Sequence, residues 1–130
     1  MGIFKSLFGE GKKEENKKES YVNWIQLKSI EQLKEIDKLS NHEPIAIFKH
    51  STRCGISRMV IQRFEEGFDE ALKDFKVYYL DLLNYRELSN EIGYKYQVLH
   101  QSPQLLIIKK GVAIAYASHY DIASINLKSF

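Results

Sequence analysis

The sequence predicts an α/β fold in which helices cover both faces of a mixed β-sheet. Segments rich in β-branched and aromatic residues alternate with amphipathic segments, in the order β-α-β-α-β-α-β-β-α. The last two predicted strands are separated only by Lys110 and Gly111, so we expect them to form an antiparallel hairpin. The length of 130 residues suits a single domain of this kind.

Composition excludes several classes of protein. Two prolines and seven glycines are too few for a collagen-like chain or a Pro/Gly-driven disordered chain. The net charge of +2, from 19 basic and 17 acidic residues, offers no concentrated basic face for nucleic acid. No apolar run approaches the ~20 residues that span a bilayer. We therefore expect no nucleic-acid partner and no integral membrane segment.

Residues 1–20 are predicted to form a flexible, charged N-terminal tail, followed by one domain over residues 21–130. The stretch from Glu10 to Ser20 has no large apolar residue and cannot contribute to a core. The first nine residues carry a short apolar patch that matches the form of an N-myristoylation pattern. That pattern is short and often matches by chance, so a loose tail is the simpler interpretation.

The first predicted elements of the domain are a strand, a helix and a second strand. Residues 21–27 are rich in aromatic and β-branched side chains, which favours a strand. Ser29 offers an N-cap with Gln32 as its capping-box partner, and this helix is expected to end around residues 40–42. The continuous apolar run over residues 44–50 is typical of a buried parallel strand.

Each later element has a pattern of its own, either a buried apolar run or apolar residues at helical spacing. The expected elements are a helix from Cys54 to near Leu72, a strand over 77–82, a helix over 86–96, strands over 104–109 and 112–117, and a terminal helix from Asp121, as N-cap, to Leu127.

Cys54 is the only cysteine, which excludes an internal disulfide and a zinc site built from several thiolates. It falls between a buried strand and an amphipathic helix, at the start of the helix. The unpaired N–H groups of a first helical turn and the positive end of the helix dipole favour a thiolate there. Arg53 adds a positive charge next to it. This pattern indicates a reactive, nucleophilic thiol.

Ser57 stands three residues after Cys54, where a dithiol Cys-X-X-Cys reductase has its second cysteine. A hydroxyl can donate a hydrogen bond to a thiolate but cannot resolve a disulfide, so a second thiol must come from outside. Gly55 leaves one face of the sulfur uncrowded. The Ser102-Pro103 bond is a candidate cis peptide, and its loop is expected to face Cys54 and to bind an extended thiol ligand through its backbone.

These features together resemble the thioredoxin superfamily. Within it, the stretch from Phe48 to Ser57 resembles the YtxJ family of monothiol bacilliredoxins, whose signature is Thr-X-Cys-Pro-Ile-Ser; Gly55 stands where that family commonly has proline. The resemblance extends from about Trp24 to the C-terminus. It implies a thioredoxin-like fold and an oxidoreductase whose Cys54 takes bacillithiol from S-bacillithiolated cytoplasmic proteins. Another low-molecular-weight thiol would then regenerate Cys54.

The expected site and partners follow from this resemblance and from the motifs above. Cys54 is the expected nucleophile, and Ser57 is expected to stabilise its thiolate. Bacillithiol is the expected co-substrate, with no tightly bound cofactor and no metal, and its carboxylates offer Arg53 a ligand. The residues expected to bind substrate are Thr52, Arg53, Gly55, Ser102 and Pro103.

Two other functions stay open, as do simpler roles for several residues. A monothiol-glutaredoxin-like carrier of iron–sulfur clusters and glutathione has a similar Cys-Gly-Phe-Ser run, but Ile56 replaces its phenylalanine here. A thioredoxin-like interaction module with an inert thiol is the third possibility. Ser57 could simply cap the helix, and Arg53 could be an ordinary surface residue. His50 and His100 are more simply core or edge histidines than bases for Cys54.

Overall fold

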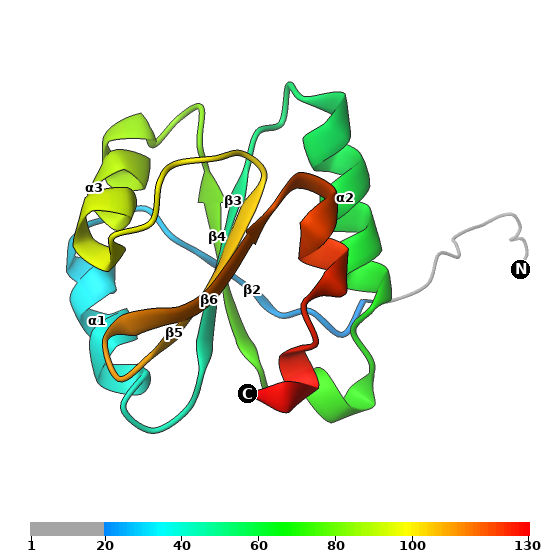
Figure 1. Cartoon of the computed structure of the whole chain (residues 1–130), viewed down its shortest axis with the longest axis horizontal. Helices are drawn as coiled ribbons and strands as arrows, with labels where there is room; N and C mark the ends of the chain where they lie inside the picture. Colours follow the sequence, from blue (N-terminus) through cyan, green and yellow to red (C-terminus); the bar gives the residue numbers. More distant parts are fainter. Residues whose placement is uncertain (1–19) are drawn as a thin grey trace, which may run out of the picture.

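A five-stranded mixed sheet forms the centre of the protein, with the strand order β2-β4-β3-β5-β6 (Figure 1). The computed structural model describes residues 20–130. β4 pairs in parallel with β2 and β3, whereas β5 runs antiparallel to both β3 and β6. The predicted mixed sheet with a final hairpin is therefore confirmed. The strands are β2 (Trp24–Gln26), β3 (Ile45–His50), β4 (Lys76–Asp81), β5 (Gln104–Lys109) and β6 (Val112–Ser118).

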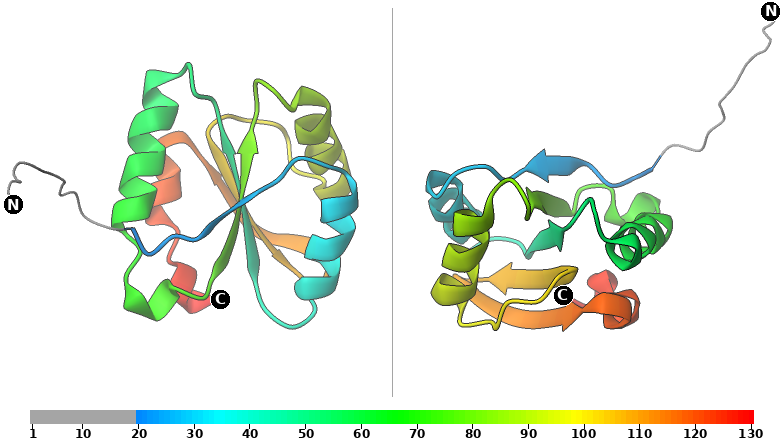
Figure 2. Two further views of the ribbon diagram at one scale, coloured as in Figure 1. Left: turned by 180° about the vertical axis from the view of Figure 1, so that it is seen from behind. Right: turned by 90° about the horizontal axis from the view of Figure 1, so that it is seen from above.

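Helical segments cover both faces of the sheet, as Figure 2 shows from behind and from above. α1 (Glu31–Leu39) and α3 (Arg86–Tyr96) lie on one face. α2 (Gly55–Glu66) and the 3-10 turn η2 (His119–Ser124) lie on the other. Each helical layer encloses its own hydrophobic cluster against the sheet.

β3 is buried along its whole length and supplies side chains to both layers. Ile45 and Ile47 belong to the cluster under α1 and α3, whereas Ala46 and Phe48 belong to the cluster under α2. This alternation follows from the two-residue period of a strand. The same alternation directs the last two side chains of β3, those of Lys49 and His50, toward opposite layers.

Trp24 ties the edge strand β2 to the α2 layer. Its indole Nε1 donates to Glu65 Oε2 at 2.7 Å. Its ring lies 5.8 Å from the rings of Phe48 and Phe64 and 5.6 Å from that of Tyr79, measured between centroids. Aromatic pairs at such separations stabilise a core beyond the area they bury.

Tyrosine hydroxyls bond α1 to β4 and to α3, its neighbours on the same face of the sheet. Tyr78 donates to Glu35 at 2.8 Å, and Tyr96 donates to Asp37 at 2.8 Å. Burial and the adjacent carboxylates raise the pKa of both phenols above their ordinary value. Both groups therefore stay protonated donors at neutral pH.

The ends of two predicted helices are corrected by the structure. α2 ends at Glu66 rather than near Leu72, because Asp69 is extended and its carboxylate accepts from Ala71 N at 3.0 Å. That bond starts the separate 3-10 turn η1 (Glu70–Leu72). The terminal helix expected over residues 121–127 is instead η2 followed by a second 3-10 turn, η3 (Leu127–Ser129).

Other predicted boundaries shift by a few residues. The strand expected over 21–27 is confined to β2, and the N-cap of α1 is Ile30 rather than Ser29. Only the Gln32 half of the predicted capping box forms as expected, with its Oε1 accepting from Lys28 N at 2.7 Å and Ser29 N at 3.1 Å. Helix α3 and strand β5 have the predicted bounds.

Both ends of the described chain lie beside the C-terminal end of α2. Ser20 lines a hollow together with Gln62 and Glu66, and Lys128 Nζ bonds Asp69 Oδ2 at 2.6 Å just beyond that helix. The predicted tail and its apolar patch fall outside the described residues, apart from Ser20. Among residues 20–130, no helix has both the length and the apolar character needed to cross a bilayer.

Candidate active site

Cys54 is the N-cap residue of α2. Its backbone is extended, with φ −101° and ψ 122°, and its carbonyl accepts the first intrahelical hydrogen bond, from Arg58 N at 3.0 Å. Its own N–H donates to Ser51 O at 3.2 Å, which closes a tight turn. The residue is partly exposed. The thiol thus belongs to the residue where free N–H groups of a first turn stabilise negative charge.

The Ser57 hydroxyl holds the loop before Cys54 against the first turn of α2. Ser57 is fully buried, and its Oγ accepts from Ser51 N at 3.1 Å. The same Oγ lies 2.8 Å from His50 Nδ1. In the described part of the chain, the hydrogen bonds of this hydroxyl go to these two groups and not to the thiol. A thiolate-stabilising role for Ser57 stays a prediction, beside a clear structural role.

His50 is a buried histidine at the end of β3, as expected, and its contact with Ser57 makes it a further candidate for the site. It ends β3, lies opposite Asp81 of β4 in the register, and packs its ring 5.7 Å from that of Tyr79. Burial lowers the pKa of His50, and Arg58 adds to this effect while Asp81 and Glu65 oppose it. The signal in the sequence was its place at the exit of a buried strand, just before the cysteine loop.

The Ser102-Pro103 loop enters the sheet next to the point where the cysteine loop leaves it. Gln104, the first residue of β5, pairs with Lys49 near the end of β3, so the first loop ends beside the start of the second. The Ser102-Pro103 bond is cis, and Pro103 O accepts from His119 N at 2.9 Å. The register therefore brings this loop to the same edge of the sheet as Cys54.

The remaining predicted binding residues flank Cys54 in the chain and are exposed. Thr52 and Arg53 are exposed and line a polar hollow of about 330 Å³ with Leu83 and Asn84. A side chain at Gly55 would meet only Arg58 Nη2, at 3.9 Å, so the approach to Cys54 is open on that side.

Comparison with known proteins decides the family. The model of the family described as monothiol bacilliredoxin BrxC matches residues 25–127. This chain belongs to that family. The resemblance seen in the stretch before Ser57 is thereby confirmed, and the bacilliredoxin is a thiol–disulfide oxidoreductase with one cysteine.

Solved structures similar to the bacilliredoxin confirm its thioredoxin-like fold. A candidate oxidoreductase with a thioredoxin fold is 31% identical, with a TM-score of 0.66, over 78% of this chain and 88% of that chain. Thioredoxin from Schistosoma mansoni is 19% identical, with a TM-score of 0.64, over 86% and 99% of the two chains. Thioredoxin from Malassezia sympodialis is 20% identical, with a TM-score of 0.63, over 82% and 84%.

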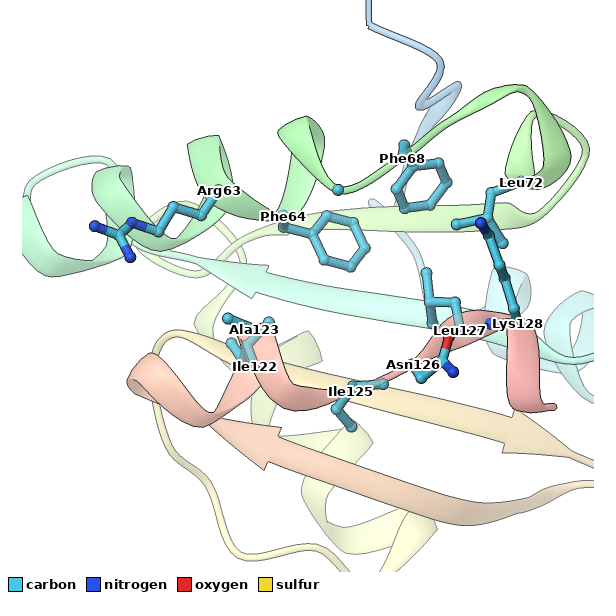
Figure 3. A pocket seen from close by; sticks show the side chains of 11 residues that line it. Arg63, Phe64, Phe68, Leu72, Ile122, Ala123, Ile125, Asn126, Leu127 and Lys128 are labelled. Atoms are coloured by element: carbon cyan, nitrogen blue, oxygen red, sulfur yellow. Dashed lines mark hydrogen bonds between the residues drawn. The ribbon is translucent and has the colours of Figure 1, made fainter.

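A groove on the bacilliredoxin lies away from this site. Figure 3 shows it between the C-terminal end of α2 and the C-terminal turns, lined by Phe64, Phe68 and Leu127 among others, with a volume of about 210 Å³. It contains none of the predicted site residues. Across residues 20–130, no cluster of three or more His, Cys, Asp or Glu side chains could hold a metal ion.

Proposed function

We propose that this bacilliredoxin removes bacillithiol from S-bacillithiolated cytoplasmic proteins. The observation that carries the proposal is the position of the sole cysteine at the N-cap of α2, with a serine in place of the second cysteine. Such a protein holds one half of a redox couple and depends on a small thiol for the other half.

The proposed reaction has two exchange steps that balance in electrons. The Cys54 thiolate attacks the bacillithiol sulfur of the mixed disulfide, and the target protein leaves as a thiolate. Cys54 is then bonded to bacillithiol. A second low-molecular-weight thiolate attacks this disulfide, so Cys54 leaves as a thiolate and a small-molecule disulfide forms. The target thiol is reduced, the incoming thiol is oxidised, and bacillithiol leaves as one half of the small-molecule disulfide.

The surroundings of Cys54 suit both partners of this exchange. Arg53 offers a charge to the carboxylates of bacillithiol, and the polar hollow beside it offers space. The backbone of the Ser102-Pro103 loop can pair with an extended segment of the ligand. Ile56 and Met59, both exposed on α2 just after the thiol, give the target protein an apolar contact.

Release of bacillithiol from a purified bacillithiolated protein tests the proposal. The wild type without added thiol should release one equivalent of target thiol and gain the mass of bacillithiol on Cys54. With excess bacillithiol it should turn over. Cys54→Ala should do neither, and Arg63→Gln, altered at the far end of α2, should match the wild type. Equal release by wild type and Cys54→Ala would contradict the proposed function.

A further inference from the structure

The Ser57 hydroxyl has two possible hydrogen-bonding arrangements, because its two neighbours differ in kind. Ser51 N–H can only donate, so it occupies one lone pair of Ser57 Oγ. His50 Nδ1, 2.8 Å away, can accept or donate, depending on whether it carries a proton. The direction in which the Ser57 proton points is therefore set by His50.

The neutral and protonated forms of His50 turn the Ser57 proton in opposite directions. A neutral ring with its proton on Nε2 accepts from Ser57 at Nδ1, so the hydroxyl proton is directed away from the thiol. An imidazolium donates from Nδ1 instead, and Ser57 then accepts from both neighbours. Its proton must find a new acceptor, and the candidate acceptor is the sulfur of Cys54, the N-cap residue three positions earlier.

We propose that His50 and Ser57 form a relay to the Cys54 sulfur, in which His50 is a positioning residue that acts through Ser57. Protonation of His50 from solvent turns the Ser57 hydroxyl toward the sulfur, where its hydrogen bond stabilises the thiolate. No proton leaves Ser57, and no bond to sulfur is made or broken by the relay. The proposal deepens the proposed function, because Cys54 is the leaving thiolate of its second step.

The groups around His50 act on its protonation in opposite directions, with burial lowering its pKa overall. Asp81 faces it from β4, and its Oδ1 is buried without a hydrogen-bond partner among residues 20–130. Arg58 and Glu65 face it from α2, and Tyr79 packs against its ring. Desolvation and Arg58 favour the neutral ring, whereas Asp81 and Glu65 favour the cation. A thiolate at Cys54, like Asp81 and Glu65, favours the protonated ring of His50.

NMR titration of the histidine rings tests the relay directly. The wild type is compared with protein S-methylated at Cys54 by methyl 4-nitrobenzenesulfonate, a uniform modification because Cys54 is the only cysteine. We expect neutral His50 in the Nε2–H form. Its titration midpoint should be higher with the free thiol than after methylation, by about 0.7 pH unit or more, corresponding to at least fivefold coupling. His42, which is exposed, should not change.

Ser57→Ala separates the relay from the direct field of a thiolate. The relay predicts that this variant loses the difference between the free and methylated forms, whereas a through-space field would leave it intact. An unchanged difference in Ser57→Ala would overturn the proposal. So would equal midpoints in the two wild-type forms, the result expected if the Ser57 proton turns to a backbone carbonyl instead. The proposal would also be overturned if NMR showed the neutral His50 ring of the wild type with its proton on Nδ1. This measurement needs no variant.

Alkylation kinetics connect the relay to the thiol. His50→Asn keeps an acceptor near the Nδ1 position but cannot titrate, so it should remove the His50-dependent inflection from the pH profile of Cys54 alkylation by iodoacetamide. His42→Asn should retain that inflection, and its loss in both variants would contradict the relay. These readouts use no bacillithiolated substrate. Failure of the proposed function would therefore leave them informative, and failure of the relay would leave bacillithiol release intact.

Discussion

Lys49 is an amine buried in the interior beside the active-site loops. It is inaccessible to solvent, and its Nζ donates to Ser89 O at 3.1 Å and lies 3.4 Å from His100 Nδ1. Burial lowers its pKa from 10.5 to about 8, because no carboxylate within residues 20–130 is close enough to offset the desolvation of the charge. This residue therefore makes the stability of the fold depend on pH.

As pH rises from about 7 to about 9.5, the free energy of unfolding of the wild type should rise relative to that of Lys49→Met. The folded protein releases the Lys49 proton near pH 8, whereas the unfolded chain holds it until near 10.5. The unfolded state thus binds more protons in this window, and the free energy of unfolding rises with pH. The expected relative gain is about 2 kcal/mol, measured by urea unfolding followed through tryptophan fluorescence.

Lys109→Met is the matched control, because Lys109 is an exposed lysine on the neighbouring strand β5. It should keep the pH dependence of the wild type. Tyr78 and Tyr96 act in the opposite direction only above about pH 10, since unfolded tyrosines ionise there while the buried ones do not. If the free energy of unfolding changed with pH in the same way for wild type and Lys49→Met, the buried amine would not be the source of the pH dependence.

Arg53→Gln should reduce kcat/KM for a bacillithiolated protein about two- to fivefold. Arg53 is exposed, and charge contacts at exposed positions contribute up to about 1 kcal/mol. The loss should shrink in high salt, because screening already weakens the contact in the wild type. Arg63→Gln carries the same charge change at the far end of α2. If both variants lose activity equally, Arg53 acts through the overall charge of the protein and not through a direct contact with the substrate.

The start of helix α2 is built to accept proline. Cys54 has the extended backbone that precedes proline, and Gly55 occupies the first helical position, whose N–H needs no helical partner. Gly55→Pro should therefore raise the free energy of unfolding by about 0.4–1 kcal/mol, mainly by restricting the unfolded chain.

Thermal unfolding monitored by circular dichroism measures this effect, with Gly67→Pro as the contrasting variant. Gly67 N–H donates to Arg63 O at 3.1 Å and to Phe64 O at 3.2 Å, and proline would remove these bonds. Gly67→Pro should lower the midpoint while Gly55→Pro raises it. A lower midpoint for Gly55→Pro would show that the loop around Cys54 needs the glycine.

Elements with a continuous pattern were predictable, and elements held by distant contacts were not. Strand β5 and helix α3 matched because one apolar run and one helical stripe define them. Ile122 and Ile125 are spaced as in a helix, yet this segment forms two 3-10 turns that pack against the end of α2. A short apolar spacing fits both a helix and a pair of 3-10 turns, so only the tertiary contact decides between these two structures.

The candidate site shows the same division. The position of Cys54 at a helix start follows from a buried strand and an amphipathic stripe, which the sequence displays. The hydrogen bond between Ser57 and His50 does not follow from the sequence, because it joins residues seven apart across a turn whose geometry no local pattern specifies. The family match likewise supports the chemistry of the thiol without assigning the partners of Ser57.

At the scale of the whole molecule, the two hydrophobic clusters draw their buried residues from Val22 to Leu127. A chain that begins at Ser20 should therefore unfold at the same urea concentration as the full chain, as judged by Trp24 fluorescence. A chain that begins at Lys28 lacks strand β2 and the aromatic contacts of Trp24, and circular dichroism should show a much lower midpoint. Equal midpoints for all three chains would contradict this account of the core.

The arrangement of the chain ends has a practical consequence for measurement in cells. Ser20 and Lys128 both lie near the C-terminal end of α2, whereas Cys54 lies at its N-terminal end, a full twelve-residue helix away. A fluorescent reporter or a solid support could therefore be attached at either terminus while the sulfur faces free solution. Such an attachment would leave the open side of the active-site helix free to meet another protein.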